Sequence, residues 1–264
     1  MLKDISLGQY FPKDSAIHRL DPRFKIIITA IYIAILFCTD SFGGLLVGTL
    51  FAWIVWFMTK IPVKLMWKSL KPILPIIVLT AILNLFMVEG DKTLWSWAFL
   101  SISDKGLHEC IFNAVRIVML IVGTSILTYT TSPVSLTDAI ERLFSPLKKF
   151  NVPVHELAMM MTIALRFIPL LIDETDKIVS AQKSRGASFE TGTIKERASA
   201  IVPVIVPLLV SAFRRSEELA LAMECRCYHG GEGRTRLKQL HIHPTDWVAL
   251  TVSIVVLLVN IVVF

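Results

Sequence analysis

The sequence contains no Gly-x-x-x-x-Gly-Lys-Ser/Thr phosphate loop, so the chain itself is not expected to hold ATP in the usual way. Residues 1–21 are charged and lack an apolar stretch followed by small residues, so no cleavable signal peptide is expected. Only four cysteines occur, in apolar and basic segments alike, and they do not form a disulfide framework by pattern. These absences argue against an ATPase and against a disulfide-stabilised secreted protein.

Apolar residues are abundant, at 54% of the 264 residues, which is more than a soluble domain hides from water. The hydrocarbon core of a bilayer, about 30 Å thick, needs roughly 20 mostly apolar residues in a helix. Five runs approach that length, and the sequence therefore predicts an all-α membrane protein with about five transmembrane helices. The runs are 24–39, 42–58, 72–88, 111–131 and 247–264.

The basic residues predict how these helices are oriented, because short cytoplasmic loops retain Lys and Arg during insertion. The N-terminal arm carries five basic residues, and the connection 59–71 carries four lysines and no acid. The segment 89–109 carries two lysines against four acids, so it is expected outside. We therefore expect a multi-pass protein of the cell membrane with a cytoplasmic N-terminus and an external C-terminus.

These patterns divide the chain into three parts. Residues 1–131 are expected to form an N-terminal transmembrane domain of four spans, and residues 246–264 a C-terminal transmembrane helix. Residues 132–245 between them hold many Lys and Arg residues yet remain rich in Leu, Ile, Val, Met and Ala. We expect this middle part to be a cytoplasmic domain built on long amphipathic helices.

The middle part contains two long helical runs, 154–187 and 195–228, which resemble each other. Each run ends in Ala-x-x-x-Arg, and the arginines are Arg185 and Arg226. A cation is favoured at a helix C-terminus, and Gly186 or the pair Gly230-Gly231 could supply a left-handed turn there. Each arginine could simply decorate a helix end. The duplication instead favours a partner with two equivalent sockets.

The motifs Ser184-Arg185-Gly186 and Cys225-Arg226-Cys227, with Asp21-Pro22-Arg23 before the first span, give the chain a family resemblance. It resembles the transmembrane T component of energy-coupling factor (ECF) transporters, which import vitamins and transition-metal ions. That family is marked by two x-Arg-x motifs, often Ala-Arg-Gly, at the ends of two long cytoplasmic coupling helices. Ser184, Cys225 and Cys227 depart from the commoner small residues.

The resemblance implies a non-catalytic coupling subunit without a cofactor, working with other proteins and with no nucleic acid. Two cytoplasmic ABC ATPases would each receive one coupling helix, and a membrane-embedded S component would bind the vitamin. The residues implied at the ATPase sockets are Arg185 and Arg226 with Ser184, Gly186, Cys225 and Cys227. The residues implied as a platform for the S component, or alternatively as internal packing, are Leu157, Met160, Met161 and Leu165.

Two other functions are alternatives to a coupling subunit. A stand-alone secondary transporter is the main alternative, although the spans show no inverted repeat and almost no buried acid for ion coupling. A membrane enzyme would have to use the acid cluster Asp173, Glu174 and Asp176, which lacks a matching His or metal partner. No metal is expected at Cys225 and Cys227, because Cys-x-Cys in a helix points its side chains apart.

Two features outside the middle part remain open at this point. Residues 93–103 are expected to form an external hairpin or to place aromatic side chains at the bilayer interface. Arg116, within the fourth span, is expected to extend toward the interface or to contact that hairpin.

Overall fold

The computed structural model describes residues 10–87, 93–97, 100–187, 189, 193–230 and 240–263. By its internal contacts the chain divides into two compact units. One comprises the described parts of 137–238, and the other the described parts of 8–136 and 239–264. The functional division at residues 131 and 245 remains a prediction.

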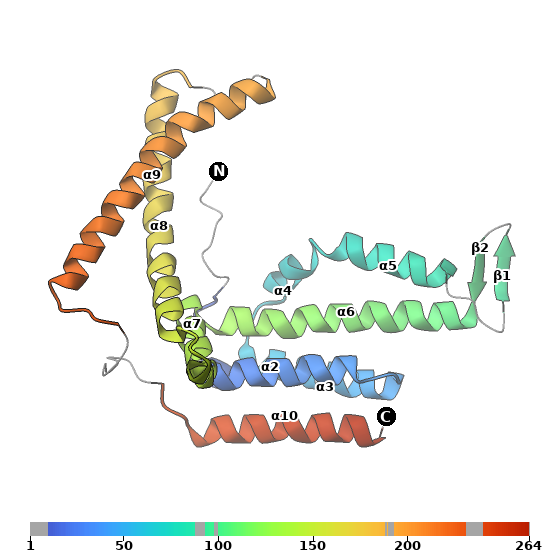
Figure 1. Cartoon of the computed structure of the whole chain (residues 1–264). Helices are drawn as coiled ribbons and strands as arrows, with labels where there is room; N and C mark the ends of the chain where they lie inside the picture. The colour runs from blue at the N-terminus through green and yellow to red at the C-terminus, as the bar shows by residue number, and fades with distance from the viewer. Residues whose placement is uncertain are drawn as a thin grey trace. The chain divides into compact units, whose positions relative to one another are not determined.

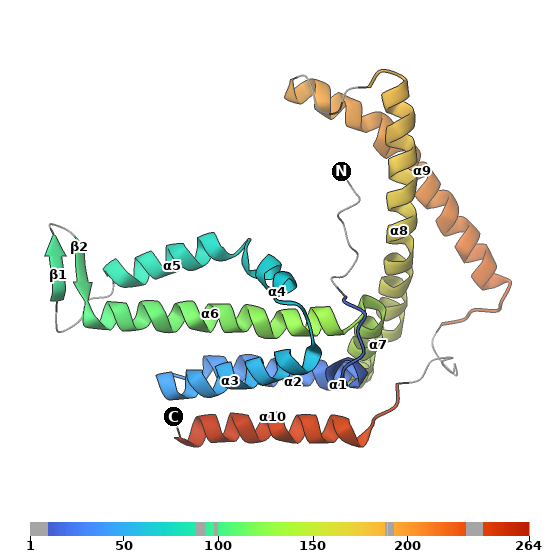
Figure 2. The ribbon, with the colours of Figure 1, turned by 180° about the vertical axis from the view of Figure 1, so that it is seen from behind.

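The larger unit is a layered bundle of helices with one antiparallel hairpin (Figures 1 and 2). Long helix α6 packs against α2, α3, α4 and α5, while α10 packs against α2 and α3. Its elements are α1 Ala16–Arg19, α2 Pro22–Phe37, α3 Phe42–Thr59, α4 Val63–Leu70, α5 Leu74–Met87, β1 Thr93–Trp97, β2 Leu100–Ser103, α6 Asp104–Thr130 and α10 Pro244–Val263. The paired strands show that the hairpin forms, and the rest of the described chain is helical or connecting.

The expected number of spans agrees with the structure, but their membership differs. Within the described residues, five helices are long and apolar enough to cross a membrane, namely α3, α6, α8 (Val154–Ser184), the stretch Ser199–Glu224 of α9 (Ile194–Glu224), and α10. Helix α2 has 16 residues and falls short of that length, and α4 with α5 forms a candidate sixth span bent by 59°. Length and composition alone therefore do not separate α8 and α9 from the spans.

Helices α2 and α10 run parallel, and a shared carboxylate joins their N-terminal ends. Asp21 is the N-cap of α2, and Pro22 follows at the first helical position, where its missing N–H costs nothing. The Asp246 carboxylate accepts hydrogen bonds from the backbone N–H of Asp21 at 2.9 Å and of His243 at 2.7 Å. Asp246 is fully buried, and its carboxylate satisfies one N–H before each helix.

The opposite ends of these helices are also joined by polar contacts. Thr39 donates its hydroxyl to the Asn260 side-chain carbonyl at 2.6 Å, and the Asn260 amide donates to the Gly44 carbonyl at 2.9 Å. Arg116 donates to the Thr39 carbonyl, and its guanidinium lies 4.5 Å from the centre of the Phe112 ring. Arg116 therefore fixes the turn between α2 and α3, a contact that the sequence did not indicate.

Close approach of backbone and ring shapes the core of the bundle, where Tyr32, Leu36 and Ala52 are buried together. A Cβ added at Gly123 of α6 would overlap the Tyr32 ring. Gly123 therefore provides the space that the ring occupies, and the Tyr32 hydroxyl donates to the Met119 carbonyl at 3.2 Å. The absence of a side chain at this one position sets how closely α2 and α6 approach.

The smaller unit consists mainly of two long helices. Helix α7 (Pro133–Leu143) leads from α6 into this unit, and a 3₁₀ helix, η1 (Ser145–Phe150), follows it. The break falls beside Pro146, whose ring and missing N–H disfavour continuation of an α-helix. The Glu141 carboxylate and His155 Nδ1 lie 2.9 Å apart, which joins α7 to the start of α8.

Candidate functional site

Helices α8 and α9 form an antiparallel pair, and their crossing is visible in Figure 1. Gln182, near the end of α8, donates to the Pro203 carbonyl of early α9 at 3.5 Å. At the other end, the Tyr228 hydroxyl donates to the Met159 sulfur near the start of α8 at 3.1 Å. Because the helices run in opposite directions, their C-terminal ends lie at opposite ends of the pair.

The end of α8 is a closed left-handed turn that carries Arg185. The N–H of Arg185 donates to the Ala181 carbonyl at 3.2 Å, and the N–H of Ala187 donates to the Gln182 carbonyl at 3.0 Å. The residue between them, Gly186, has φ +88°, which an L side chain rarely adopts. This is the hydrogen-bond pattern of a glycine-terminated helix, and it exposes the Arg185 side chain.

The end of α9 repeats most of this turn. The N–H of Arg226 donates to the Met223 carbonyl at 3.1 Å, as the N–H of Arg185 also does to the equivalent Gln182 carbonyl at 3.1 Å. The N–H of Tyr228 donates to the same Met223 carbonyl at 3.1 Å, as that of Ala187 does to Gln182. Cys227 stands where the first turn has glycine, and its φ of 52° is left-handed. The prediction that Gly230-Gly231 supplies the left-handed turn at the end of this helix is therefore wrong, because Cys227 supplies it. Gly230 has φ +95° but comes three residues later, and Gly231 lies outside the described residues.

Both arginine side chains are exposed at these ends. Within the described part of the chain, neither guanidinium makes a hydrogen bond or an ion pair with another residue. The flanking Ser184, Gly186 and Cys225 are exposed as well. The two turns thus present two free planar donors in similar backbone conformations. We refer to residues 181–187 and 222–228 as the two tips.

Three of the four residues expected to form an apolar platform lie open on α8. Leu157, Met160 and Met161 are 47%, 57% and 50% exposed, whereas Leu165 is half-buried. Internal packing therefore does not occupy the first three side chains within the described chain, and it accounts in part for the fourth.

A second exposed apolar face, on α9, was missed by the sequence reading. It consists of two adjacent rows of large side chains spaced four residues apart, which is the spacing of one helix face. Reading 3.6-residue periodicity along 201–213 could have found it. The residues are Ile201, Val202, Ile205, Val206, Leu209, Val210 and Phe213.

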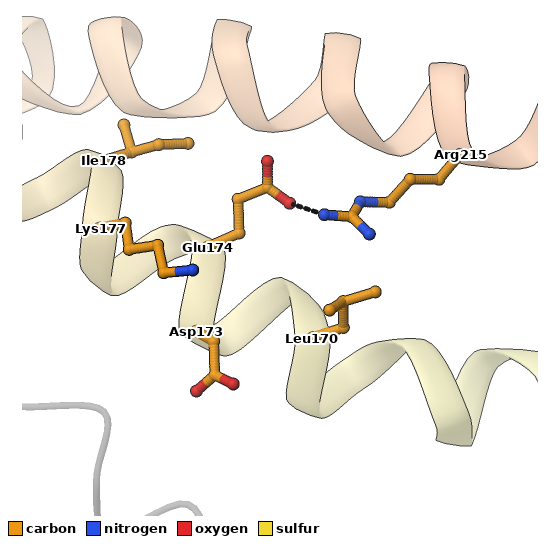
Figure 3. A pocket seen from close by; sticks show the side chains of 6 residues that line it. All are labelled: Leu170, Asp173, Glu174, Lys177, Ile178 and Arg215. Atoms are coloured by element: carbon orange, nitrogen blue, oxygen red, sulfur yellow. Dashed lines mark hydrogen bonds and ion pairs between the residues drawn. The ribbon is translucent and has the colours of Figure 1, made fainter.

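Between the tips, α8 and α9 are joined by an ion pair with a second hydrogen bond. Arg215 donates to Glu174 Oε2 at 2.9 Å, and the Ser211 hydroxyl donates to Glu174 Oε1 at 2.6 Å. Figure 3 shows Glu174 directed at α9, while Asp173 points away from it. The Glu174 carboxylate is thus engaged in joining the two helices.

In the described part of the chain, no group of three or more His, Cys, Asp or Glu side chains lies together in a way that could hold an ion. All four cysteines are free, and Cys225 and Cys227 are both exposed beside Arg226.

Comparison with known proteins bears on this arrangement. Residues 13–237 match the family CbiQ, described as cobalt transport protein. The chain is 53% identical over 255 residues to the energy-coupling factor transporter transmembrane protein EcfT of Ruminiclostridium cellulolyticum, covering 97% of this chain and 95% of that one. It is 51% identical over 262 residues to that of Clostridium kluyveri (99% and 97%) and 44% over 259 residues to that of Bacillus subtilis (98% and 96%).

Proposed function

Because the chain belongs to the family of energy-coupling factor transporter transmembrane proteins, we propose that it passes ATP-driven motion from two cytoplasmic ATPases to a separate substrate-binding membrane protein. It is a multi-pass membrane protein of such a transporter. In this proposal it catalyses nothing itself, and the cargo, a vitamin or a transition-metal ion, is chosen by the S component.

The observation that carries the proposal is the repetition of one tip on two antiparallel helices. Arg185 and Arg226 occupy the same place in the same left-handed turn, and both are exposed. A guanidinium offers five donors in a rigid fork and can fix both position and orientation against carboxylates or carbonyls. Tips at opposite ends of the helix pair suit two separate ATPase subunits better than one.

The S component would lie against the open apolar side chains of the helix pair. Leu157, Met160 and Met161 on α8 supply flexible, exposed contacts, and the exposed face of α9 extends that surface. Met side chains repack at low cost, which suits a surface that must release its partner in each cycle. Leu165 contributes less because it is half-buried.

Charges within α8 and α9 support a cytoplasmic place for these helices, although both are long enough to span a bilayer. Asp173, Glu174, Asp176 and Lys177 lie inside α8, and four charged residues lie in 214–218 of α9. Such groups are costly at membrane depth. With α8 and α9 outside the bilayer, α2, α3, the α4–α5 pair, α6 and α10 cross it, which puts the N-terminus inside and the C-terminus outside.

The test is co-purification of the ATPases with the full chain in mild detergent. Arg185→Ala and Arg226→Ala should each weaken ATPase retention by about tenfold or more, the scale for losing a charged group from an interface. Arg185→Lys and Arg226→Lys should recover little, because lysine lacks the planar fork. Arg214→Ala is the matched control, since Arg214 is exposed on α9 and pairs only with Glu218 of its own helix within the described chain.

Two outcomes would contradict the proposal. Full ATPase retention and full uptake by the double variant of Arg185 and Arg226 would show that the ATPases grip elsewhere. Solute accumulation by this chain reconstituted alone would favour the secondary transporter instead.

A further inference from the structure

The ion pair between α8 and α9 occupies equivalent positions in the two helices. Glu174 lies 11 residues before Arg185, and Arg215 lies 11 residues before Arg226. At 1.5 Å per residue, each tip is about 16 Å along its helix from the pair. Because the helices are antiparallel, the segments 174–185 and 215–226 extend in opposite directions from the ion pair, which lies midway between the tips.

Opposite charges at these equivalent positions have a physical reason. In a pair of helices related by approximate two-fold symmetry, equivalent residues meet near the axis, and like charges there would repel. Glutamate on one helix and arginine on the other convert that repulsion into attraction. The two helices therefore carry opposite charges where they cross, whereas both carry an arginine at the equivalent position of their tips.

The geometry around the pair resists sliding of one helix along the other. Glu174 accepts from both Arg215 and Ser211, so both carboxylate oxygens are held by α9. Both charged side chains are partly shielded, at 23% and 36% exposed, beside a small cavity of about 260 Å³ lined also by Leu170 and Ile178.

We propose that the Glu174–Arg215 pair is the pivot of the helix pair, a positioning contact at equal distance from the two tips. It fixes the distance between the tips, so that motion of one tip moves the other. The proposal rests on the proposed function, in which each tip engages one ATPase. Neither residue touches ATP or cargo in it. Apolar ridges alone would let the helices shift by small steps, whereas two directed hydrogen bonds to one carboxylate set a single register.

The experiment is a double-mutant cycle with Glu174→Gln, Arg215→Gln and the two together, in the full transporter complex. Three quantities are measured: ATPase co-purification, solute uptake per ATP hydrolysed, and the tip-to-tip distance distribution. Spin labels on non-natural amino acids at Ser180 and Leu221, exposed equivalent positions near the tips, report the distance while Cys225 and Cys227 at the second tip are kept. Arg214→Gln is the matched control, because its partner is on its own helix.

Each single replacement should broaden the distance distribution and lower uptake per ATP by roughly fivefold, while the ATPases stay attached. The double replacement should be no worse than either single one, since both remove the same contact. Arg214→Gln should behave as the unmodified protein does.

The pivot proposal is contradicted if the single variants leave the tip-to-tip distance distribution and the uptake per ATP unchanged. It is also contradicted if the losses of uptake in the two single variants multiply in the double variant. Those results would leave the proposed function standing, provided that the ATPases co-purify. Failure of the unmodified chain to retain ATPases would instead reject the proposed function itself.

Discussion

The left-handed turn at the second tip leads to a prediction whose magnitude follows from the backbone. Cys227 has φ 52°, and an L residue in that region costs about 1–2 kcal/mol relative to glycine. Glycine loses roughly 0.5–1 kcal/mol more conformational entropy on ordering. Cys227→Gly should therefore stabilise the turn by a net ~0.7 kcal/mol, or about threefold in its opening equilibrium, since 1.4 kcal/mol corresponds to tenfold.

The opposite change at the first tip gives the mirror-image expectation. Gly186 has φ +88°, and a Cβ there would meet nothing within 4 Å, so only backbone strain opposes a side chain. Gly186→Ala should destabilise that turn by about the same ~0.7 kcal/mol.

Amide hydrogen exchange on the purified full chain measures both effects. The Tyr228 N–H closes the second turn, and its exchange should slow about threefold in Cys227→Gly. The Ala187 N–H closes the first turn, and its exchange should quicken about threefold in Gly186→Ala. Each variant leaves the other tip as an internal control. Faster exchange at Tyr228 in Cys227→Gly, or slower exchange at Ala187 in Gly186→Ala, would refute the reasoning.

Further predictions concern the helical bundle, and thermal unfolding in detergent measures each. Gly123→Ala should destabilise the bundle by about 1–3 kcal/mol, because the added Cβ would overlap the Tyr32 ring. Thr124→Ala, on the exposed side of the same helix, should be nearly neutral, and equal midpoints for both variants would contradict the close approach. Asp246→Ala should cost about 1–3 kcal/mol, because the buried Asp21 N–H loses its acceptor. An unchanged midpoint would show that this N–H finds another partner.

The fold could be predicted in part because helix formation in a membrane protein is a local property. Long apolar runs predicted helices, and the basic middle part predicted two more that begin and end within a few residues of α8 and α9. The third span was the exception. The segment that precedes this span, which contains lysines, forms helix α4. Helices α4 and α5 therefore form a bent pair, which the hydropathy of residues 72–88 does not show.

The candidate site could likewise be predicted only in part from the sequence. The two tips could be predicted from the sequence, because the end of a helix depends on residues that are close together in the chain. These are the arginine, the turn residue after it and the four residues before it. That Cys227 takes the left-handed conformation was not visible, since glycines follow closely in the sequence.

What the sequence determined by itself is thus the membrane class, the long helices and the repeated arginine tips, all set by contacts between near neighbours in the chain. Only the tertiary structure decided that α8 and α9 are antiparallel, that Glu174 meets Arg215, and that Asp246 closes the start of α2. These contacts join residues from 41 to 225 positions apart. Their formation depends on how whole helices pack, which no local pattern of residues specifies.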